Sequence, residues 1–472
     1  MGRLIGKDWF VLLLFTLVTF ALYFPVLGNG FLIDDYAALY RILVEKRILF
    51  REFLRPLIDI SFYFNWLYSG LHPAGYYIFN FAVHILVCFM TWKVARLLPI
   101  FSRTGGAATR QTGHTVQTGG AATRQSTFAL VSGLLFALYP FHNESIVWLS
   151  GRLSSMAALC AMTAIYLALT KRAPWDFVLP ALLLIIGLFS YESILPLPLI
   201  ILVWQKDLFR DRKKITRAVL GWAAVGVVCI AIRYLLAGSL LPEYGLEGME
   251  GRAGNGIFMR LIKAFGRSVL PPSDASGRMM LLFAIVAGLV ILLHMRLWRR
   301  RAEDGFSFTG YTRLCLSFVL AMAMPVIGAV STRTSEGDRL LYFPSCFLCM
   351  MAAALVLRLA AGKGLRWSLV VLFAAGGLLL IEENNRHWLV ASRTAGTILD
   401  TLAASPAGKT VLINAPDEYE GAFIFRNNFE QALTIHGIPA SDVLVNNYLL
   451  RKEALSAEGP IGVTGAADSL HI

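Results

Sequence analysis

Long apolar stretches separated by short polar segments run along most of this chain. About eleven of them are predicted to be transmembrane helices, because a helix of about 20 residues, rising 1.5 Å per residue, crosses a hydrocarbon core of roughly 30 Å. Three of these, beginning at Thr127, Phe177 and Ile194, are short and contain or border proline. The eleven segments lie near residues 9–27, 75–97, 127–139, 151–170, 177–189, 194–204, 218–237, 279–298, 314–331, 340–361 and 365–381.

The first loop, residues 29–74, mixes apolar, aromatic and charged residues at helical spacing. The run that begins at Tyr40 predicts an amphipathic helix that lies on the membrane, ends at Pro56 and roofs a cavity. A second short amphipathic helix is predicted from Ile257 to Val269. The apolar stripe of the first helix consists of Ile42, Leu43, Leu49, Phe50, Phe53 and Leu54.

The domain organisation follows from where the apolar pattern stops. Residues 1–388 are predicted to form an all-α polytopic transmembrane domain, with residues 29–74 as its first outer loop. Residues 99–126 contain TGGAATRQ twice and are predicted to be a flexible cytoplasmic linker, because they are rich in Gly and Thr and lack aliphatic bulk. Residues 389–472 are predicted to form a small extracytoplasmic α/β domain, with a strand in KTVLINAP at residues 409–416.

The composition supports a membrane location. The chain is 57% hydrophobic and 15% charged, and its mean hydropathy of +0.62 is that of an integral membrane protein. Lys and Arg gather in alternate loops, which predicts a cytoplasmic N-terminus and a periplasmic C-terminus. The net charge of +13 is then explained by topology and by contact with anionic membrane lipids, and nucleic acid is not expected as a partner. The first span is expected to stay uncleaved, because FPVLGNG has no small-x-small cleavage site.

Cysteine and histidine are the residue types that could form disulfides or bind a metal in this chain. All six cysteines lie inside apolar segments, so no disulfide framework is predicted, and the C-x-x-C of Cys346 and Cys349 is interpreted as a pair of buried thiols. His142 and Glu144 form an H-x-E, but no H-x-x-x-H or H-E-x-x-H spacing accompanies it. No structural metal is predicted, and a divalent cation that assists a phosphate stays an open alternative.

Polar residues gather at the outer ends of the predicted helices. Asp34 and Asp35 stand side by side directly after the first apolar stretch, where charge is costly and therefore indicates function. Each of the other polar residues, taken singly, is also compatible with a packing role. The remaining candidates are Arg55 with Asp59 and Asn65, His72 with Asn80 and His84, HNES at 142–145, Tyr191 with Glu192, and TSEGDRLLYFP at 334–344.

Sugar transfer from a lipid phosphate needs only part of the equipment of a glycosidase. The leaving group is already a stabilised phosphate anion, so one carboxylate base is enough where a glycosidase needs an acid as well. One or two arginines are then needed to hold the departing phosphate. The outer polar residues of this chain supply both kinds of group.

Several ordered motifs resemble one family. GFLIDDYAALY, LRPLIDISFYFNWLYSGLHPAGYYIFNFAVH, LLFALYPFHNESIVWLSGRLSSMAALCAMTAIYLA and DRLLYFPS are similar to the membrane part of the GT-C glycosyltransferases, in particular the tetratricopeptide-repeat transmembrane O-mannosyltransferases and their bacterial relatives. The resemblance covers about residues 29–204 and 335–345. It implies a GT-C-like helix bundle, a polyprenyl-phosphate-linked sugar donor and an inverting reaction.

The resemblance also implies roles for individual residues. Asp34 would be the catalytic base, and Asp35 would orient its loop or bind the acceptor. Arg55 and Arg339 would bind the donor phosphate. The implied substrate cavity comprises His72, Asn80, His84, His142, Glu144 and Glu192.

Two departures from the family pattern limit what is carried over. Tyr191 stands before Glu192 where the family often has lysine, and no 34-residue helical period follows Trp388. The acceptor is therefore left open between a protein and a lipid-linked glycan. The predicted function is transfer of a hexose, with mannose as one candidate, to an acceptor hydroxyl at the outer face of a bacterial inner membrane. The alternatives are a transporter or flippase of lipid-linked sugars and a non-enzymatic subunit of polysaccharide assembly.

Overall fold

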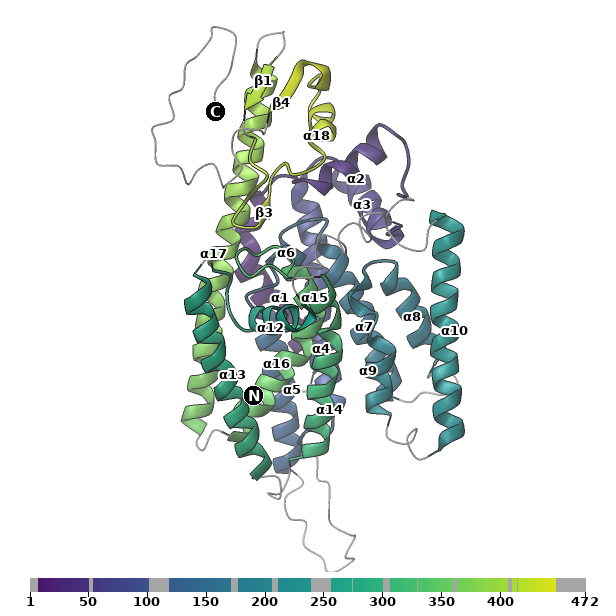
Figure 1. Cartoon of the computed structure of the whole chain (residues 1–472), viewed down its shortest axis with the longest axis vertical. Helices are drawn as coiled ribbons and strands as arrows, with labels where there is room; N and C mark the ends of the chain where they lie inside the picture. The colour runs from purple at the N-terminus through teal and green to yellow at the C-terminus, as the bar shows by residue number, and fades with distance from the viewer. Residues whose placement is uncertain are drawn as a thin grey trace, which may run out of the picture.

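A bundle of long helices makes up most of the molecule, and a smaller unit caps one end of it (Figure 1). The computed structural model describes residues 7–50, 54–101, 119–170, 177–205, 211–238, 256–273, 275–299, 306–328, 330–359, 363–405, 410–413 and 415–446. The helices up to residue 204 are α1 (Asp8–Tyr23), η1 (Phe24–Gly28), α2 (Asp34–Leu43), α3 (Pro56–Ser69), α4 (Pro73–Leu97), α5 (Gly119–Ala137), α6 (Asn143–Ile146), α7 (Arg152–Thr170), α8 (Val178–Leu188), η2 (Glu192–Ile194) and α9 (Leu197–Trp204).

The second half of the chain adds the remaining helices and all four described strands. The helices are α10 (Arg212–Ala237), α12 (Ile257–Arg267), α13 (Ser276–Arg299), α14 (Phe308–Ala321), α15 (Ala323–Gly328), η4 (Asp338–Leu341), α16 (Tyr342–Leu359), α17 (Lys363–Ala404), α18 (Phe429–Ile435) and η5 (Ala440–Asp442). The strands are β1 (Thr410–Ile413), β2 (Glu418–Tyr419), β3 (Ala422–Phe423) and β4 (Val443–Asn446).

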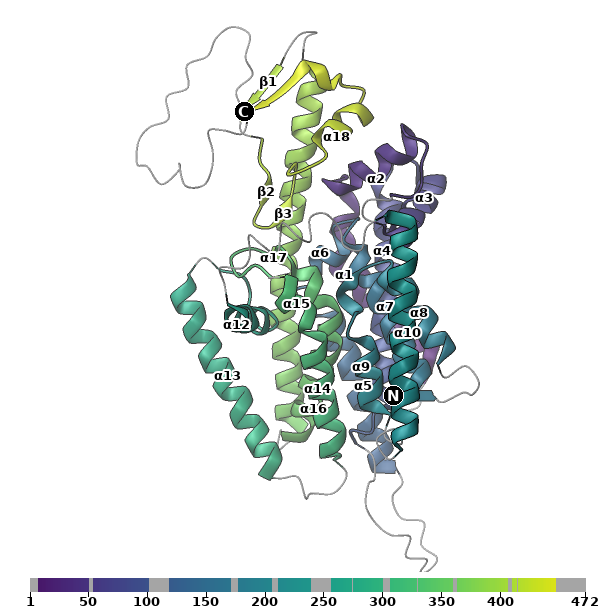
Figure 2. The same cartoon turned by 45° about the vertical axis from the view of Figure 1, so that its right-hand side comes forward.

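The centre of the bundle is formed by α4, α5, α7 and α16. α4 packs against both α5 and α7, and α16 packs against α5. Large side chains such as Tyr77, Trp92 and Phe128 are fully buried between them. In contrast, α10 and α13 lie at the periphery and expose leucines such as Leu235 and Leu292 (Figures 1 and 2). Exposed leucines on peripheral helices are suited to contact with lipid tails, because a lipid solvent imposes no penalty on apolar surface.

Each of the eleven predicted apolar segments is helical over most of its length in the structure. Seven helices of the described residues are long and apolar enough to cross a membrane. They are Asp8–Gly28, Pro73–Leu97, Arg152–Thr170, Arg212–Ala237, Phe308–Gly328, Asp338–Arg358 and Gly364–Ala404. The chain is therefore an all-α polytopic membrane protein, as predicted, and the count of eleven spans stays a prediction.

The first loop folds differently from its prediction. The helix expected to run from Tyr40 to Pro56 is wrong: α2 ends at Leu43, and the following described residues to Phe50 are not helical. Pro56 begins α3 rather than ending a helix. Proline is favoured in the first turn of a helix because the N–H that it lacks has no partner there anyway. The helix predicted at Ile257 to Val269 is confirmed as α12.

Two predicted boundaries also change. The predicted linker at 99–126 overlaps α5, which begins at Gly119, so its last part is helical; residues 102–118 lie outside the described residues. The predicted domain boundary after Trp388 falls inside α17, which runs for 42 residues to Ala404. At 1.5 Å per residue α17 is about 63 Å long, so it extends well beyond a hydrocarbon core of roughly 30 Å.

The unit that follows α17 contains both helices and strands, as predicted. β1 pairs with β4 in parallel, and β2 pairs with β3 as a short antiparallel ladder. The strand predicted in KTVLINAP is confirmed as β1. In this unit α18 packs against α2, so the C-terminal unit covers the first loop (Figure 2).

Candidate active site

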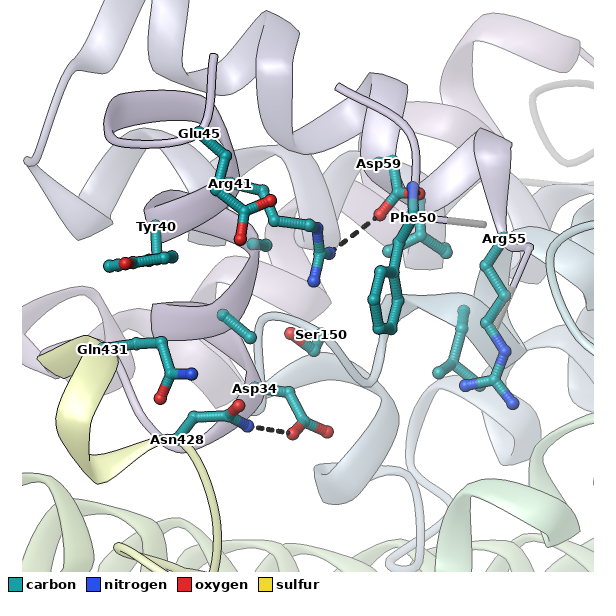
Figure 3. A pocket seen from close by; sticks show the side chains of 14 residues that line it. Asp34, Tyr40, Arg41, Glu45, Phe50, Arg55, Asp59, Ser150, Asn428 and Gln431 are labelled. Atoms are coloured by element: carbon teal, nitrogen blue, oxygen red, sulfur yellow. Dashed lines mark hydrogen bonds and ion pairs between the residues drawn. The ribbon is translucent and has the colours of Figure 1, made fainter. Parts of the chain in front are cut away.

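A pocket of about 280 Å³ opens between the first loop and the C-terminal unit. Its walls come from α2, from residues around Phe50 and Arg55, from the start of α3, from the turn before α7, and from α18 with the residue before it. Figure 3 shows Asp34 and Asn428 together on one side and Arg55 on the other. Among the predicted candidate residues, Asp34, Arg55 and Asp59 line this pocket.

Asp34 is the first residue of α2, where the positive end of the helix dipole favours an anion. Its Oδ1 accepts a hydrogen bond of 2.8 Å from Nδ2 of Asn428. Burial raises the pKa of Asp34 above its usual range, while the nearby charges of Arg339, Arg55 and Arg41 and the bond from Asn428 act in the opposite direction. A carboxylate with a raised pKa beside three cations is suited to accept a proton.

Asp35 does not line the pocket and is 1% exposed. Its Oδ2 accepts from the backbone N–H of Leu32 at 3.0 Å, and its Oδ1 accepts from the backbone N–H and the hydroxyl of Ser150 at 2.9 and 2.6 Å. Burial raises the pKa of Asp35 to about 7. Asp35 thus ties the start of α2 to the turn before α7, next to Ile33, whose φ is 35°.

Arg55 lies across the pocket from α2. Its Nη2 is 3.6 Å from Oε2 of Glu192, and its guanidinium lies 5.3 Å from the ring centroid of Tyr191. Glu192 begins η2 and is partly exposed. The two residues predicted separately from the first loop and the fifth apolar segment are therefore an ion pair at the edge of the pocket.

Arg339 is held by Glu144. The backbone N–H of Arg339 donates to Oε2 of Glu144 at 2.8 Å, and its guanidinium forms an ion pair with Oε1. The guanidinium also lies 5.5 Å from the ring centroid of Trp148. Burial raises the pKa of Glu144, and the charge of Arg339 opposes this shift. Glu144 is fully buried, whereas the side chain of Arg339 is 26% exposed and is thus accessible to a ligand.

The other predicted cavity residues lie away from this pocket. Asn80 donates to the carbonyl of Ile146 at 3.0 Å, Nδ1 of His84 is 2.6 Å from the Tyr342 hydroxyl, and Nε2 of His142 is 2.8 Å from Oγ of Ser345. All three are fully buried and hold α4, α6 and α16 together. His72 is exposed at the start of α4. Their predicted role as substrate-cavity residues is a proposal that these contacts do not require.

Sequence reasoning missed several residues of the site. Asn428 and Gln431 line the pocket from the C-terminal unit, and Arg41 lines it from α2, paired with Asp59 at 3.1 Å. Arg41 could have been noticed, because it lies about two helical turns after Asp34 and directly follows the motif GFLIDDYAALY. Nothing in the sequence points to Asn428, which is 394 positions from its partner.

Arg152 is a further buried cation beneath the pocket. Its Nη1 donates to Oδ1 of Asn65 at 2.5 Å, and its Nε donates to the carbonyl of Leu149 at 2.9 Å. It is fully buried between the rings of Phe62 and Phe79. Its bonds fix the turn that carries Ser150, so Arg152 acts on the site through structure. The sequence analysis did not single out Arg152, although a basic residue at the start of an apolar segment is a signal that could have found it.

The part of the chain that the structure describes contains no group of three or more His, Cys, Asp and Glu side chains placed to hold a metal ion. Within that part, the cations closest to Asp34 are supplied by arginine side chains. A divalent cation that assists a phosphate stays an open alternative.

No family model matches the chain. Protein O-mannosyl-transferase Tmtc3 of Drosophila melanogaster is 32% identical over 110 residues, which are 23% of this chain and 11% of that protein. Protein O-mannosyl-transferase Tmtc1 of the same organism is 32% identical over 111 residues, 23% of this chain and 10% of that protein. TMTC3 of Mus musculus is 26% identical over 117 residues, 25% of this chain and 10% of that protein. The chain spans about a tenth of the length of these curated relatives.

One solved structure extends the similarity to nearly the whole chain. The crystal structure of ArnT from Cupriavidus metallidurans bound to undecaprenyl phosphate superposes with a TM-score of 0.50 at 14% identity, and covers 93% of this chain and 90% of ArnT. Identity this low supports a shared fold and nothing more. The chain therefore has the polytopic helical fold of ArnT and, in agreement with its motifs, resembles the GT-C glycosyltransferases.

Proposed function

We propose that this protein is a membrane glycosyltransferase that transfers a hexose from a polyprenyl phosphate to an acceptor hydroxyl. The observation that carries the proposal is the placement of Asp34 in a pocket with Arg55 on its opposite side and Arg339 within electrostatic reach. A base and a cation in one pocket, with a second cation near the base, are the groups that transfer from a lipid phosphate requires.

The reaction would proceed as a single displacement. Asp34 takes the proton of the acceptor hydroxyl while the oxygen of that hydroxyl forms a bond to the anomeric carbon of the sugar. The bond between that carbon and the phosphate oxygen breaks, and its electron pair leaves with the polyprenyl phosphate. The guanidinium groups of Arg55 and Arg339 stabilise the extra negative charge on the phosphate. Because attack and departure take place on opposite faces of the carbon, the configuration inverts.

The relatives support the choice of substrates. The similar animal proteins are named as protein O-mannosyl-transferases, and the ArnT structure holds undecaprenyl phosphate. By analogy we propose a polyprenyl-phosphate hexose as donor, with mannose to be tested first. The acceptor is proposed to be a hydroxyl of a protein or of a lipid-linked glycan. Alternation of basic loops supports a pocket at the outer face of a bacterial inner membrane, with the N-terminus inside and the C-terminus outside.

The test is direct reconstitution. Purified protein in liposomes is given radiolabelled polyprenyl-phosphate mannose or glucose, together with either a Ser/Thr-rich peptide or a polyprenyl-diphosphate-linked sugar. The expected result is a labelled acceptor whose anomeric bond is inverted. Release of polyprenyl phosphate from the donor is followed by mass spectrometry. Movement of the intact donor across the bilayer without transfer would instead establish a flippase. If neither sugar transfer nor donor movement is observed, the remaining alternative is a non-enzymatic subunit of polysaccharide assembly.

A further inference from the structure

The residue that bonds the proposed base comes from the C-terminal unit. Asn428 directly precedes α18 and donates from Nδ2 to Oδ1 of Asp34 at 2.8 Å (Figure 3). Gln431, one turn further along, lines the same pocket. The C-terminal unit is thus a wall of the pocket, although it lies nearly 400 residues from α2 in sequence.

The backbone at Asn428 is suited to asparagine. Its φ is 64° and its ψ is 25°, which is the left-handed region. Among residues with a side chain, Asn adopts this conformation most readily, whereas most others are strained there. Glycine also adopts this conformation readily, and it would be sufficient if the residue before α18 had only a structural role. Glycine at this position would lack the side-chain amide that donates to Asp34.

The C-terminal unit is anchored on both sides of the site. On one side, the rings of Phe425 and His436 pack against Tyr36 of α2, at centroid distances of 6.4 and 6.0 Å. On the other side, Oγ of Ser335, four residues before Arg339, donates to the carbonyl of Glu420 at 3.1 Å.

Two further contacts fix the second anchor. Gly421 has a φ of +87°, and a Cβ there would lie 2.6 Å from the backbone nitrogen of Ser335. These two segments of the backbone are therefore in close contact. Arg426 forms ion pairs with Glu336 and with Glu418. These anchors hold Asn428 in a set position relative to both Asp34 and the loop that carries Arg339.

We propose that Asn428 is a positioning residue for Asp34, and that the C-terminal unit through it completes the acceptor side of the pocket. This inference rests on the proposed function for its chemical meaning. The Asn428 amide occupies Oδ1 of Asp34, so that Oδ2 is directed at the acceptor hydroxyl. The bond also favours the ionised carboxylate, which is the form that acts as a base. Asn428, Gln431, Ser150 and Tyr40 offer uncharged hydrogen-bonding groups, which suit a hydroxyl-bearing acceptor.

The experiment compares two neighbouring asparagines in the full-length protein. Asn428→Gly keeps the left-handed backbone and removes the amide, and Asn427→Gly makes the same change at an exposed neighbour as the control. The first readout is modification of Asp34 by a hydrophobic carbodiimide, which reacts with the protonated carboxyl, followed by peptide mass spectrometry across pH. The pH of half-modification should rise in Asn428→Gly and stay unchanged in Asn427→Gly.

Other charged groups around Asp34 are left intact by both variants. These are Arg41, Glu45, Arg55, Asp59, Arg339 and the buried Asp35. Any difference between the two variants therefore reports the Asn428 bond. An equal carbodiimide profile in the two variants would overturn the inference, whether or not the protein transfers sugar.

The second readout is release of polyprenyl phosphate from labelled polyprenyl-phosphate mannose. Asn428→Gly should lower kcat about 10-fold or more, with donor KM retained, and should shift the acidic limb of the rate profile to higher pH. Asn428→Asp, which keeps the shape but replaces the donor by a like charge, should be at least as impaired. A carbodiimide shift with no turnover in the wild type would retain the role of Asn428 and refute the proposed function. Turnover by the wild type with no effect of Asn428→Gly would support the proposed function and refute the role of Asn428.

Discussion

Glu144 receives both the backbone N–H and the guanidinium of Arg339, a residue 195 positions later in the chain. The carboxylate is fully buried, while the side chain of Arg339 reaches a partly exposed position. One buried acid therefore sets the direction of a cation that was predicted to bind phosphate. Glu144 of the H-x-E motif and Arg339 of the DRLLYFPS motif therefore form one ion pair.

Arg339→Lys should weaken donor binding about 10-fold or more while the fold survives. Lysine keeps the positive charge but loses the planar fork that can hold Glu144 and a phosphate at the same time. Binding of polyprenyl phosphate to the purified protein, measured by thermal shift across lipid concentration, tests this. Arg333→Lys, at an exposed neighbour in the same loop, is the control. Equal affinity in both variants would remove Arg339 from the donor site.

Asp34→Asn should lower turnover about 10² to 10⁴-fold, the usual contribution of a general base, with donor affinity retained. The amide keeps the size of the side chain and cannot accept the proton. Asp417→Asn, in an exposed part of the C-terminal unit, should turn over donor at the wild-type rate. If Asp34→Asn is fully active while a well-folded Asp35→Asn is inactive, the roles of the two acids must be exchanged.

Asp35→Asn should act on stability more than on chemistry. An amide can accept from one side only, so either Ser150 or Leu32 loses its acceptor, at a cost of about 1–3 kcal/mol. The folded pKa of about 7 exceeds the ordinary 3.8, so the folded state holds the proton more tightly. That contribution to stability is complete below about pH 4 and is lost as the pH rises through 7. The melting temperature should therefore depend less on pH between about pH 4 and 7 in Asp35→Asn than in the wild type. An unchanged pH dependence would refute this prediction.

Gly151→Ala should damage the turn that carries both Glu144 and Ser150. A Cβ at Gly151 would lie 1.8 Å from the backbone carbonyl oxygen of Glu144, so the turn must shift, at a cost of about 1–3 kcal/mol. Gly226→Ala in α10 meets nothing within 4 Å and should be neutral or stabilise by up to about 1 kcal/mol. Melting temperatures and donor turnover of the two variants provide the comparison, and equal values would contradict the close contact.

The proposed orientation can be tested by cysteine labelling in sealed inner-membrane vesicles. Asp417→Cys should react with a membrane-impermeant maleimide from the periplasmic side, and Lys213→Cys should react from the cytoplasmic side. Both positions are exposed, and Lys213 lies in the first turn of α10, within a basic segment of the kind retained inside. Labelling of both from one side would show that the number of spans between them was misjudged by an odd number.

The membrane fold could be predicted because its signal is local. Apolar length and the position of Lys and Arg depend on neighbouring residues alone, and all eleven predicted segments are helical. The first loop was predicted less well, because the amphipathic pattern of residues 44–50 fits a helix as well as the non-helical segment observed, whose Phe50 N–H donates to Asp59 of α3. Helix α17 continues beyond Trp388 because the C-terminal unit covers it, with Phe423 against Trp388 at 6.1 Å.

By itself the sequence determined that this protein crosses a membrane many times, and it singled out Asp34, Arg55 and Arg339 by residue type and order. Tertiary structure alone decided which partners they have. Adjacent residues at the start of a helix point in different directions, so Asp34 faces the pocket while Asp35 is buried against Ser150. Asn428 joins the site only through packing of α18 on α2. Contacts between segments so far apart depend on how the whole chain packs, and no local pattern encodes them.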